Sequence, residues 1–254
     1  MKRGRSGALT CLLAMACLPA LGQEPEPAAE DLERTGSEVF SRIAQSLEPA
    51  SCTPSAARSQ WMKQYIHNPA RFERQLIDML PILDHVSYQT RKQGLPMEFA
   101  LIPFVESRFQ PKAVAKGGPT GLWQMMPNTA RHFGLRIGGQ KDGRYSVFAS
   151  TDAALEYLGE LQKRFGHWQT SIMAYNAGDS RMRGSLKRQG LRQADADRGL
   201  PTGLAPHTYA YVKKIQALSC FFLDSRRFGV NLPTSAEFKA LPSDIDLPVL
   251  DNGN

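Results

Sequence analysis

Glu106 is the residue of this 254-residue chain whose surroundings are most typical of acid–base chemistry. It follows the apolar run FALIPFV, and no further carboxylate occurs until Asp142. Burial at the end of an apolar helix raises the pKa of a carboxyl group, because desolvation disfavours the charged form. Such a glutamate holds its proton near neutral pH and can deliver it as a general acid. The alternative is an exposed, inert glutamate at a helix end, which is the commoner situation for this residue type.

The segment that follows the acid has the composition of a ligand-binding loop. Three glycines between residues 117 and 121 allow the backbone to approach a bulky ligand closely. The stretch GLWQMMP then combines the amide of Gln124 with large apolar side chains. A sugar with an N-acetyl group has a polar edge and a hydrophobic face, and it needs both kinds of partner. Trp123 and Met125 fit a packed core equally well, and both interpretations stay open.

Helical patterns dominate the chain from Trp61 onward. Apolar residues recur at spacings of three and four, and alternating strand patterns are nearly absent. Start and stop residues such as Asn68-Pro69, Gly94 and Gly178 divide this part into separate helices. We expect helices over residues 68–94, from Pro96 through the acid, from Ser150 or Thr151 to about 165, over 169–178, and one long helix over 207–229.

The two ends of the chain differ in composition from the middle. Residues 1–22 have a basic start, an apolar stretch and a small-residue exit, which predicts a secretory signal peptide. Residues 23–60 are rich in Pro, Glu and Ala, which predicts a tether with one short helix at 36–47. Residues 61–230 are expected to form a single helical domain, and residues 231–254 a loose polar tail.

Four cysteines bear on compartment and anchoring. Cys11 and Cys17 lie in the signal, and Cys17 is a candidate lipidation site, although leucine is missing at the position usual before such a cysteine. Cys52 and Cys220 remain in the mature chain. In an oxidising compartment they are expected to form one bridge, which stabilises by about 4–5 kcal/mol in the chain-entropy model. Two buried thiols are the alternative.

The charge of the chain favours a polyanionic partner without identifying one. Loss of the signal removes three basic and no acidic side chains, and it lowers the formal charge from +7 to +4. The five histidines include no ligand pair such as H-x-x-x-H, and the cysteines are scattered. We therefore expect no metal site and no cofactor.

Four blocks of the sequence resemble, in chain order, those of the lytic murein transglycosylase (SLT) domain of the lysozyme-like superfamily. They are ALIPFVESRFQPKA…GPTGLWQMMPNTARHFGL, STDAALEYLGELQKRFG, AYNAG and TYAYVKKIQAL. Upstream helices with W…Y…F…GLP are similar to those of the membrane-bound lytic murein transglycosylase D group. The resemblance covers residues 61–230, and the ordered set is far more specific than any single block. It implies a mainly α, lysozyme-like (goose-type lysozyme / SLT) single helical domain.

The resemblance also implies which residues form the site. Glu106 is the expected catalytic acid and base, and Tyr211 is its expected hydroxyl partner. For Tyr175 the alternative is a core aromatic on an apolar helix. The groove for the muropeptide is expected to involve Gln124, Met126, Tyr175 and Asn176.

Three positions depart from the pattern of the family. Ala115 stands where a serine is usual, His207 replaces a glutamate, and Ser146 replaces an aspartate. None of these changes removes the acid itself. They bear instead on substrate preference and on rate.

The activity that the resemblance implies explains the missing second carboxylate. Ordinary glycosidases use a pair of acids. A lytic transglycosylase cleaves the MurNAc-β-1,4-GlcNAc bond of peptidoglycan (murein) without water, and the product ends in 1,6-anhydro-N-acetylmuramic acid. Two alternatives remain: a goose-type lysozyme-like muramidase that activates water with Asp142 or Asp152, and a non-catalytic peptidoglycan-binding protein.

The expected setting follows from the same resemblance and the signal. Cell-wall turnover in the periplasm is expected, with an outer-membrane lipoprotein as the alternative if Cys17 is lipidated. The expected partners are glycan strands of peptidoglycan, with cell-wall or secretion machinery left open. No nucleic acid is expected, and contact with the membrane only through a lipid on Cys17.

Overall fold

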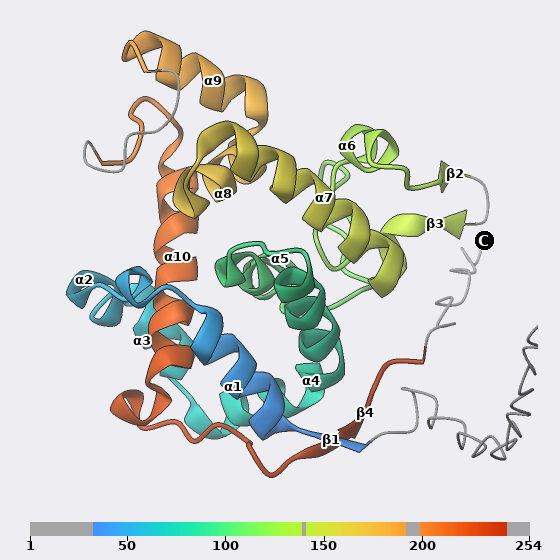
Figure 1. The fold of residues 1–254 in the computed structure, drawn as a ribbon, viewed down its shortest axis with the longest axis vertical. Helices are drawn as coiled ribbons and strands as arrows, with labels where there is room; N and C mark the ends of the chain where they lie inside the picture. Colours follow the sequence, from blue (N-terminus) through green and yellow to red (C-terminus); the bar gives the residue numbers. More distant parts are fainter. Residues whose placement is uncertain (1–32, 139–140, 192–198, 243–254) are drawn as a thin grey trace, which may run out of the picture.

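The computed structural model describes residues 33–138, 141–191 and 199–242, so the predicted signal peptide and Cys17 lie outside the described residues. Most of the described chain is helical (Figure 1), and the predicted mainly α class is confirmed. No helix in these ranges is long and apolar enough to cross a bilayer. The α-helices are α1 Gly36–Ser46, α2 Pro54–Ala57, α3 Gln60–Ile66, α4 Pro69–Lys92, α5 Ile102–Ser107, α6 Pro127–His132, α7 Val147–Phe165, α8 Trp168–Ala177, α9 Asp179–Arg188 and α10 Pro206–Leu223.

Short elements complete the described chain. Two two-stranded antiparallel sheets pair β1 with β4 and β2 with β3. The strands are β1 Glu33–Thr35, β2 Ile137–Gly138, β3 Lys141–Asp142 and β4 Glu237–Lys239, and the 3-10 helices are η1 Pro49–Ser51, η2 Met97–Leu101, η3 Gly143–Tyr145 and η5 Ser225–Phe228.

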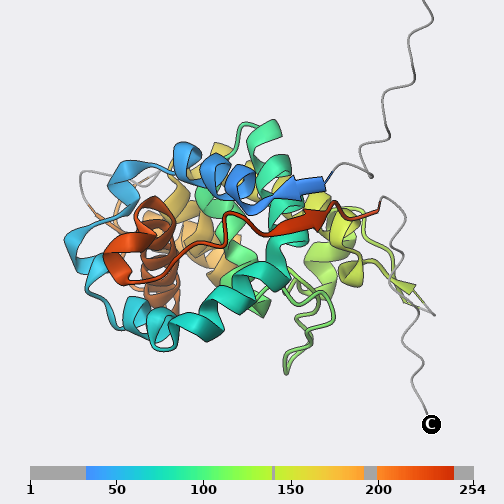
Figure 2. The same ribbon diagram turned by 90° about the horizontal axis from the view of Figure 1, so that it is seen from below.

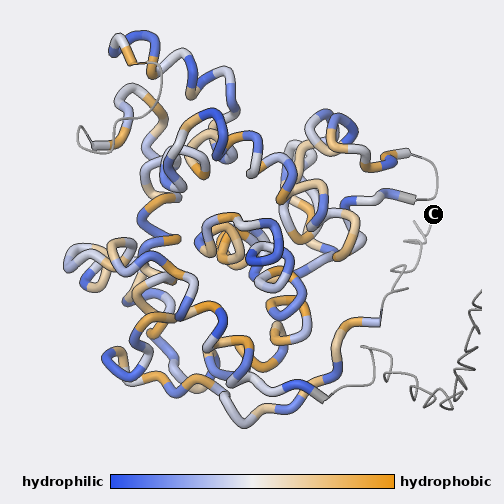
Figure 3. The backbone as a smooth tube through the Cα atoms, in the orientation of Figure 1, coloured by the Kyte–Doolittle hydropathy of each residue, from blue (hydrophilic) through white to orange (hydrophobic). Residues whose placement is uncertain are grey.

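The helix α10 organises the core. It packs against α1, α2, α3, α5 and α8, and Figure 1 shows it running beside α5, which lies in the middle of the view. Buried apolar side chains such as Val212, Ile215 and Leu218 account for these contacts. In Figure 3 apolar residues recur along α10, whereas α9 is mostly hydrophilic. The arrangement places the end of α5, which carries Glu106, against the first half of α10.

Local signals explain the helix boundaries, including two that differ from expectation. Asn68 caps α4 as predicted, and its side chain accepts from the backbone N–H of Arg71. The expected cap of α7 at Ser150 or Thr151 is wrong, because Ser146 accepts from Ala149 N and starts the helix earlier. The single helix expected over 207–229 is two elements, since α10 ends at Leu223 and η5 follows.

The tether predicted for residues 23–60 is wrong for its second half. The helix expected at 36–47 is present as α1, and its side chains Val39, Phe40 and Ile43 are buried in the common core. Arg34 and Arg42 both form ion pairs with the buried Asp84 of α4. The polar composition of this segment suggested that it does not pack onto the domain. An amphipathic helix, however, needs only one apolar stripe to join a core.

The loose tail predicted from residue 231 is also wrong for its first part. Strand β4 pairs with β1, with Phe238 opposite Arg34, and Figure 2 shows the two strands side by side. The N–H of Gly36 donates to Ala236 O at 2.9 Å. A Cβ at Gly36 would lie 2.2 Å from Pro233 O, so only glycine allows this approach. The two ends of the described chain are therefore joined by backbone hydrogen bonds.

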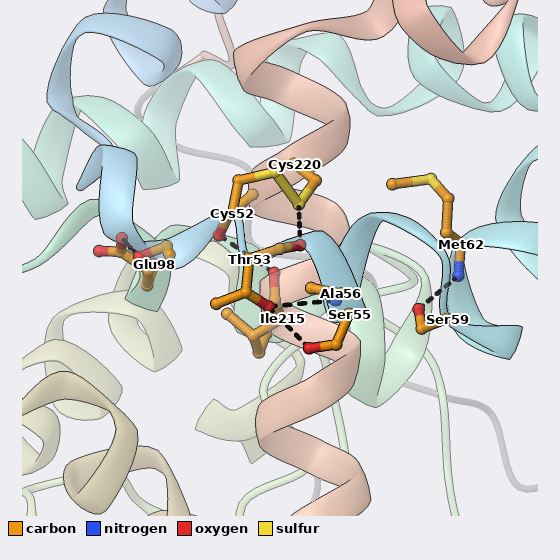
Figure 4. The surroundings of a disulfide bond; sticks show 11 residues. Cys52, Thr53, Ser55, Ala56, Ser59, Met62, Glu98, Ile215 and Cys220 are labelled. Carbon is orange, nitrogen blue, oxygen red and sulfur yellow. Dashed lines mark hydrogen bonds between the residues drawn. A yellow bond between two sulfur atoms is a disulfide. The ribbon is translucent and has the colours of Figure 1, made fainter.

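A disulfide joins Cys52 to Cys220, which confirms the expected bridge (Figure 4). It links the segment after η1 to α10 across a sequence separation of 168 residues. Glu98 is buried nearby and accepts hydrogen bonds from Ser51 Oγ at 2.6 Å and from the N–H of Glu48 at 3.1 Å. The bridge and this carboxyl group fix the N-terminal segment to the helices that carry the site.

Candidate active site

Glu106 occupies the last turn of α5, immediately before an abrupt change of direction. Arg108 and Phe109 have positive φ angles of 53° and 58°, which are uncommon for residues with side chains. Two left-handed residues in succession end the helix and turn the chain away from it. Ser107 Oγ donates to Leu122 O at 2.7 Å and so connects the helix end to the glycine-rich loop.

Glu106 is half-buried and receives a hydrogen bond from the hydroxyl of Tyr211, with Oη 2.6 Å from Oε1. Burial raises the pKa of Glu106 to about 7, although the hydrogen bond from Tyr211 and the charge of Lys214 act in the opposite direction. The carboxyl group therefore exchanges its proton readily near neutral pH. The structure places Tyr211 against the acid, as the sequence analysis expected.

Lys214 is a neighbour that the sequence analysis missed. It follows Tyr211 by three residues on α10, so the two side chains lie on adjacent turns of one face. Its Nζ lies 4.8 Å from the ring centroid of Trp61, in cation–π geometry. Trp61 thus holds the cation whose charge favours the ionised form of Glu106. The lysine spacing from the tyrosine was visible in the sequence, but its partner on α3 was not.

The glycine-rich loop is held by Arg144, which the sequence analysis also missed. Arg144 is buried, and its Nη1 donates to Gly118 O at 2.7 Å and to Met125 O at 3.1 Å. Gly121 has a φ of +82°, and a Cβ there would lie 1.9 Å from Arg144 O. Glycine is therefore required at 121 for conformation and for space. The D-x-R spacing with Asp142 was the available signal.

Gln124 faces inward more than expected. Its Nε2 donates to Ala113 O at 3.1 Å and to Gly121 O at 2.7 Å, which uses both amide hydrogens. Its backbone adopts a φ of 49°. These bonds connect the two ends of the loop, and within the described residues no hydrogen bond to the carbonyl oxygen of Gln124 is present.

The large apolar side chains of GLWQMMP divide between core and surface. Trp123 is fully buried, and its Nε1 donates to Thr151 Oγ1 at 3.1 Å. Met125 is buried as well, so the interpretation of these two as a flat surface for sugar is wrong. Met126 is 48% exposed and is the apolar side chain of this stretch that a ligand can reach.

Tyr175 and Asn176 lie at the end of α8, which Gly178 terminates as predicted. The hydroxyl of Tyr175 donates to Trp123 O at 2.8 Å, and burial together with the charge of Glu106 raises the pKa of this phenol. Asn176 Oδ1 accepts from Thr208 Oγ1 at 3.0 Å. These contacts tie α8 to the loop on one side and to α10 on the other.

The three departures from the family pattern have different surroundings. Ala115 is exposed in the loop, where its N–H donates to Pro119 O at 3.0 Å. Ser146 caps α7, a task that an aspartate performs equally well. His207 is exposed in the first turn of α10. None of the three contacts Glu106 through a hydrogen bond or an ion pair within the described ranges.

The two aspartates considered as water-activating groups are not placed alike. Asp142 accepts hydrogen bonds from Arg144 Nε and from Arg144 Nη2, the latter at 2.6 Å, so both carboxylate oxygens are engaged. Burial raises the pKa of Asp142, but the hydrogen bonds and charge of Arg144 outweigh it and hold the pKa below its usual value. Asp152 is exposed on α7. Within the described residues no three His, Cys, Asp or Glu side chains gather as metal ligands.

Comparison with known proteins shows which class of domain this helical chain resembles. Residues 86–197 match the model of the Transglycosylase SLT domain. The chain is 37% identical over 191 residues to the membrane-bound lytic murein transglycosylase D of Escherichia coli (strain K12). That match covers 74% of this chain and 42% of the relative, so the chain spans less than half the length of the relative.

Two further matches are shorter or more distant. The peptidoglycan transglycosylase gp16 of Escherichia phage T7 is 36% identical over 83 residues, which is 32% of this chain and 6% of the phage protein. The crystal structure of the lytic transglycosylase Slt from Pseudomonas aeruginosa aligns with a TM-score of 0.42 and 24% identity. That alignment covers 61% of this chain and 26% of the Slt chain.

Proposed function

We propose that the protein is a peptidoglycan lytic transglycosylase that cleaves the MurNAc-β-1,4-GlcNAc bond without water. The observation that carries this proposal is the pair formed by Glu106 and Tyr211. A carboxyl group whose pKa is about 7 serves as acid in one step and as base in the next. The SLT domain and the relatives named for murein and peptidoglycan support the choice of substrate.

In the first step Glu106 donates its proton to the glycosidic oxygen. The bond between this oxygen and C1 of MurNAc breaks, and the GlcNAc end leaves with the proton as a free hydroxyl. The carbonyl oxygen of the substrate's own N-acetyl group stabilises the positive charge at C1. This assistance takes the place of the second carboxylate that ordinary glycosidases supply.

In the second step Glu106, now ionised, removes the proton from the C6 hydroxyl of the same sugar. The C6 oxygen attacks C1 and closes the 1,6-anhydro ring. The glutamate ends the cycle protonated, as it began, and no water enters the product. Tyr211 and Lys214 favour the ionised form that the second step requires, while burial favours the protonated form that the first step requires.

The remaining site residues position the substrate in this proposal. The carbonyl oxygen of Gln124 and the exposed Met126 line the groove, with polar and apolar contacts respectively. Tyr175 and Asn176 hold the loop and α10 in place beside the acid, through Trp123 O and Thr208. No cofactor takes part.

Hydrolysis by a goose-type lysozyme-like mechanism is the second candidate, and the surroundings of the aspartates make it the weaker one. Asp142 is engaged by Arg144 through both oxygens. Digestion of purified sacculi in ¹⁸O-water separates the two reactions. Anhydro ends without ¹⁸O support transglycosylation, whereas reducing MurNAc ends that carry ¹⁸O overturn it. Release of no soluble fragment, with retained binding to sacculi, would instead identify a peptidoglycan-binding protein.

The cell envelope is the setting that this substrate requires. We infer export to the periplasm through the signal at residues 1–22, since the glycan strands lie outside the cytoplasmic membrane. The disulfide between Cys52 and Cys220 agrees with an oxidising compartment. Fractionation of cells that express the full chain, with and without Cys17→Ala, tests for soluble and outer-membrane forms.

A further inference from the structure

A cavity of about 490 Å³ lies between α9 and the beginning of α10, outside the contacts described for Glu106. Its walls come from the end of α8, from one side of α9, and from the residues around Gly203 that lead into α10. Figure 1 shows α9 above the start of α10, with α8 beside it. The volume lies within the range usual for small-molecule sites.

The lining of this cavity is cationic. It includes the guanidinium groups of Arg181 and Arg188, together with the imidazole of His207 and the hydroxyl of Ser180, and it includes no Asp or Glu. The nearby carboxylate of Asp179 does not neutralise them, because its Oδ2 is paired with Arg164 at 2.7 Å and with Arg183 at 3.1 Å. A cavity of this charge suits a ligand with carboxylate groups.

Backbone contacts hold the two guanidinium groups at the cavity. Arg181 Nη1 donates to Ala177 O at 3.0 Å. Arg188 Nη2 donates to Gly203 O at 3.5 Å, and its guanidinium group passes close to Gly184 and Gly203. Each guanidinium has five N–H donors, so most of them remain for a ligand. Positioned arginines of this kind bind carboxylates in a bidentate manner.

The cavity adjoins the proposed catalytic centre. Thr208 lines it and also donates to Asn176, the residue at the end of α8. Tyr211, which bonds Glu106, follows Thr208 by three residues on α10. Three residues of helix span about 4.5 Å along the axis. A ligand group in the cavity therefore lies within reach of a sugar bound at Glu106.

We propose that this cavity binds the carboxylates of the peptide stem that branches from MurNAc. The inference rests on the proposed function and extends it to substrate preference. The stem is attached to the same sugar whose C1 reacts, so a stem-binding site must adjoin the acid. Through Arg181 and Arg188 the enzyme favours glycan strands that carry stems over strands from which an amidase has removed them.

Binding to short glycan strands in the Glu106→Gln background tests this proposal separately from cleavage. Stem-bearing strands should bind about tenfold or more tightly than stripped strands, because the stem carboxylates form charge-assisted hydrogen bonds with the two arginines. Adding Arg181→Gln and Arg188→Gln should abolish this preference and leave the affinity for stripped strands unchanged. Strands whose stem carboxylates are amidated should bind to the unaltered cavity as weakly as stripped strands do, and this arm needs no cavity variant.

Lys187→Gln is the matched control, because it removes one positive charge from the exposed side of α9 and does not line the cavity. It should keep the preference for stem-bearing strands. Equal affinity of the Glu106→Gln protein for stem-bearing and stripped strands overturns the proposal, as does an equal loss on both strands in the arginine variant. Failure of the wild-type protein to form anhydro ends would overturn the proposed function and leave the binding preference measurable.

Discussion

Tyr211 and Glu106, which are 105 residues apart in the sequence, share a hydrogen bond of 2.6 Å between α10 and the end of α5. Burial raises the pKa of Glu106 to about 7, whereas the hydrogen bond from the Tyr211 hydroxyl favours the ionised carboxylate.

Glu106→Gln should abolish the formation of anhydro ends while the protein still folds and binds glycan. The change keeps the size of the side chain and removes the transferable proton, so the rate should fall by roughly a hundredfold or more. The measurement is the release of anhydromuropeptides from sacculi. Residual activity above about a tenth of the wild-type value contradicts the role of Glu106.

The same variant should change the pH dependence of stability. The unfolded chain ionises this carboxyl near 4.5, whereas the folded protein ionises it near 7. As the pH rises between these values, the unfolded state is favoured, so wild-type stability falls. Glu106→Gln lacks this loss. The difference in melting temperature, variant minus wild type, should be near zero at about pH 4 and positive at about pH 8. A difference that does not grow with pH would contradict the raised pKa.

Tyr211→Phe should raise the pKa of Glu106, because the hydroxyl that stabilises the carboxylate is lost. The limb of the rate profile that reports this pKa should move to higher pH. Maximal activity should fall by roughly tenfold, since the glutamate is less well oriented. The measurement is the rate of release of anhydro ends as a function of pH.

Tyr209→Phe is the control for that variant. The hydroxyl of Tyr209 donates to Pro201 O at 2.8 Å, away from the acid, so its loss loosens a loop and leaves the pKa of Glu106 unchanged. The pH profile of this variant should keep its wild-type position. A larger shift of the pH profile in Tyr209→Phe than in Tyr211→Phe would contradict the role of Tyr211 as the partner of Glu106.

Lys214→Met should also move the pH profile to higher values, because it removes the positive charge that lowers the pKa of Glu106. In the wild type Lys214 Nζ lies 4.8 Å from the ring centroid of Trp61. Methionine at this position keeps the apolar contact with that ring and lacks the charge. Maximal activity should fall less than in Tyr211→Phe, since no hydrogen bond to the acid is lost. Lys213→Met changes the same charge on an exposed position of α10 and should leave the profile in place. Identical profiles for the two lysine variants would contradict the role of Lys214.

Loss of the disulfide should destabilise the fold more than it affects the chemistry. Replacement of Cys52 and Cys220 by alanine should lower the free energy of unfolding by about 2–5 kcal/mol, because the unfolded chain is no longer closed into a long loop. Denaturant unfolding of the variant and of the wild type, with and without reductant, measures this. A reduced wild-type protein that unfolds at the same denaturant concentration as the oxidised one would contradict it.

The sequence by itself determined the mainly helical class and indicated Glu106 as the candidate acid. The start of α4 at Asn68 and the end of α8 at Gly178 follow from caps that act within one turn. The apolar periods predicted α7 and α10 as helices, but not all of their bounds. Glu106 stood out because an apolar run precedes it and no further carboxylate follows until Asp142. The blocks that resemble the SLT domain occur in order along the chain, so the resemblance also predicted Tyr211 as the hydroxyl partner of Glu106.

Only the tertiary structure decided which side chains face the site and which face the core. Trp123 and Met125 are buried, although their composition suited a sugar equally well. Arg144 and Lys214 act on the site through contacts with distant elements, which no local period encodes. The packing of α1 and β4 onto the domain depends in the same way on pairings with α4 and β1 far along the chain. Local propensity acts over a few residues, whereas burial and charge are set by the whole fold.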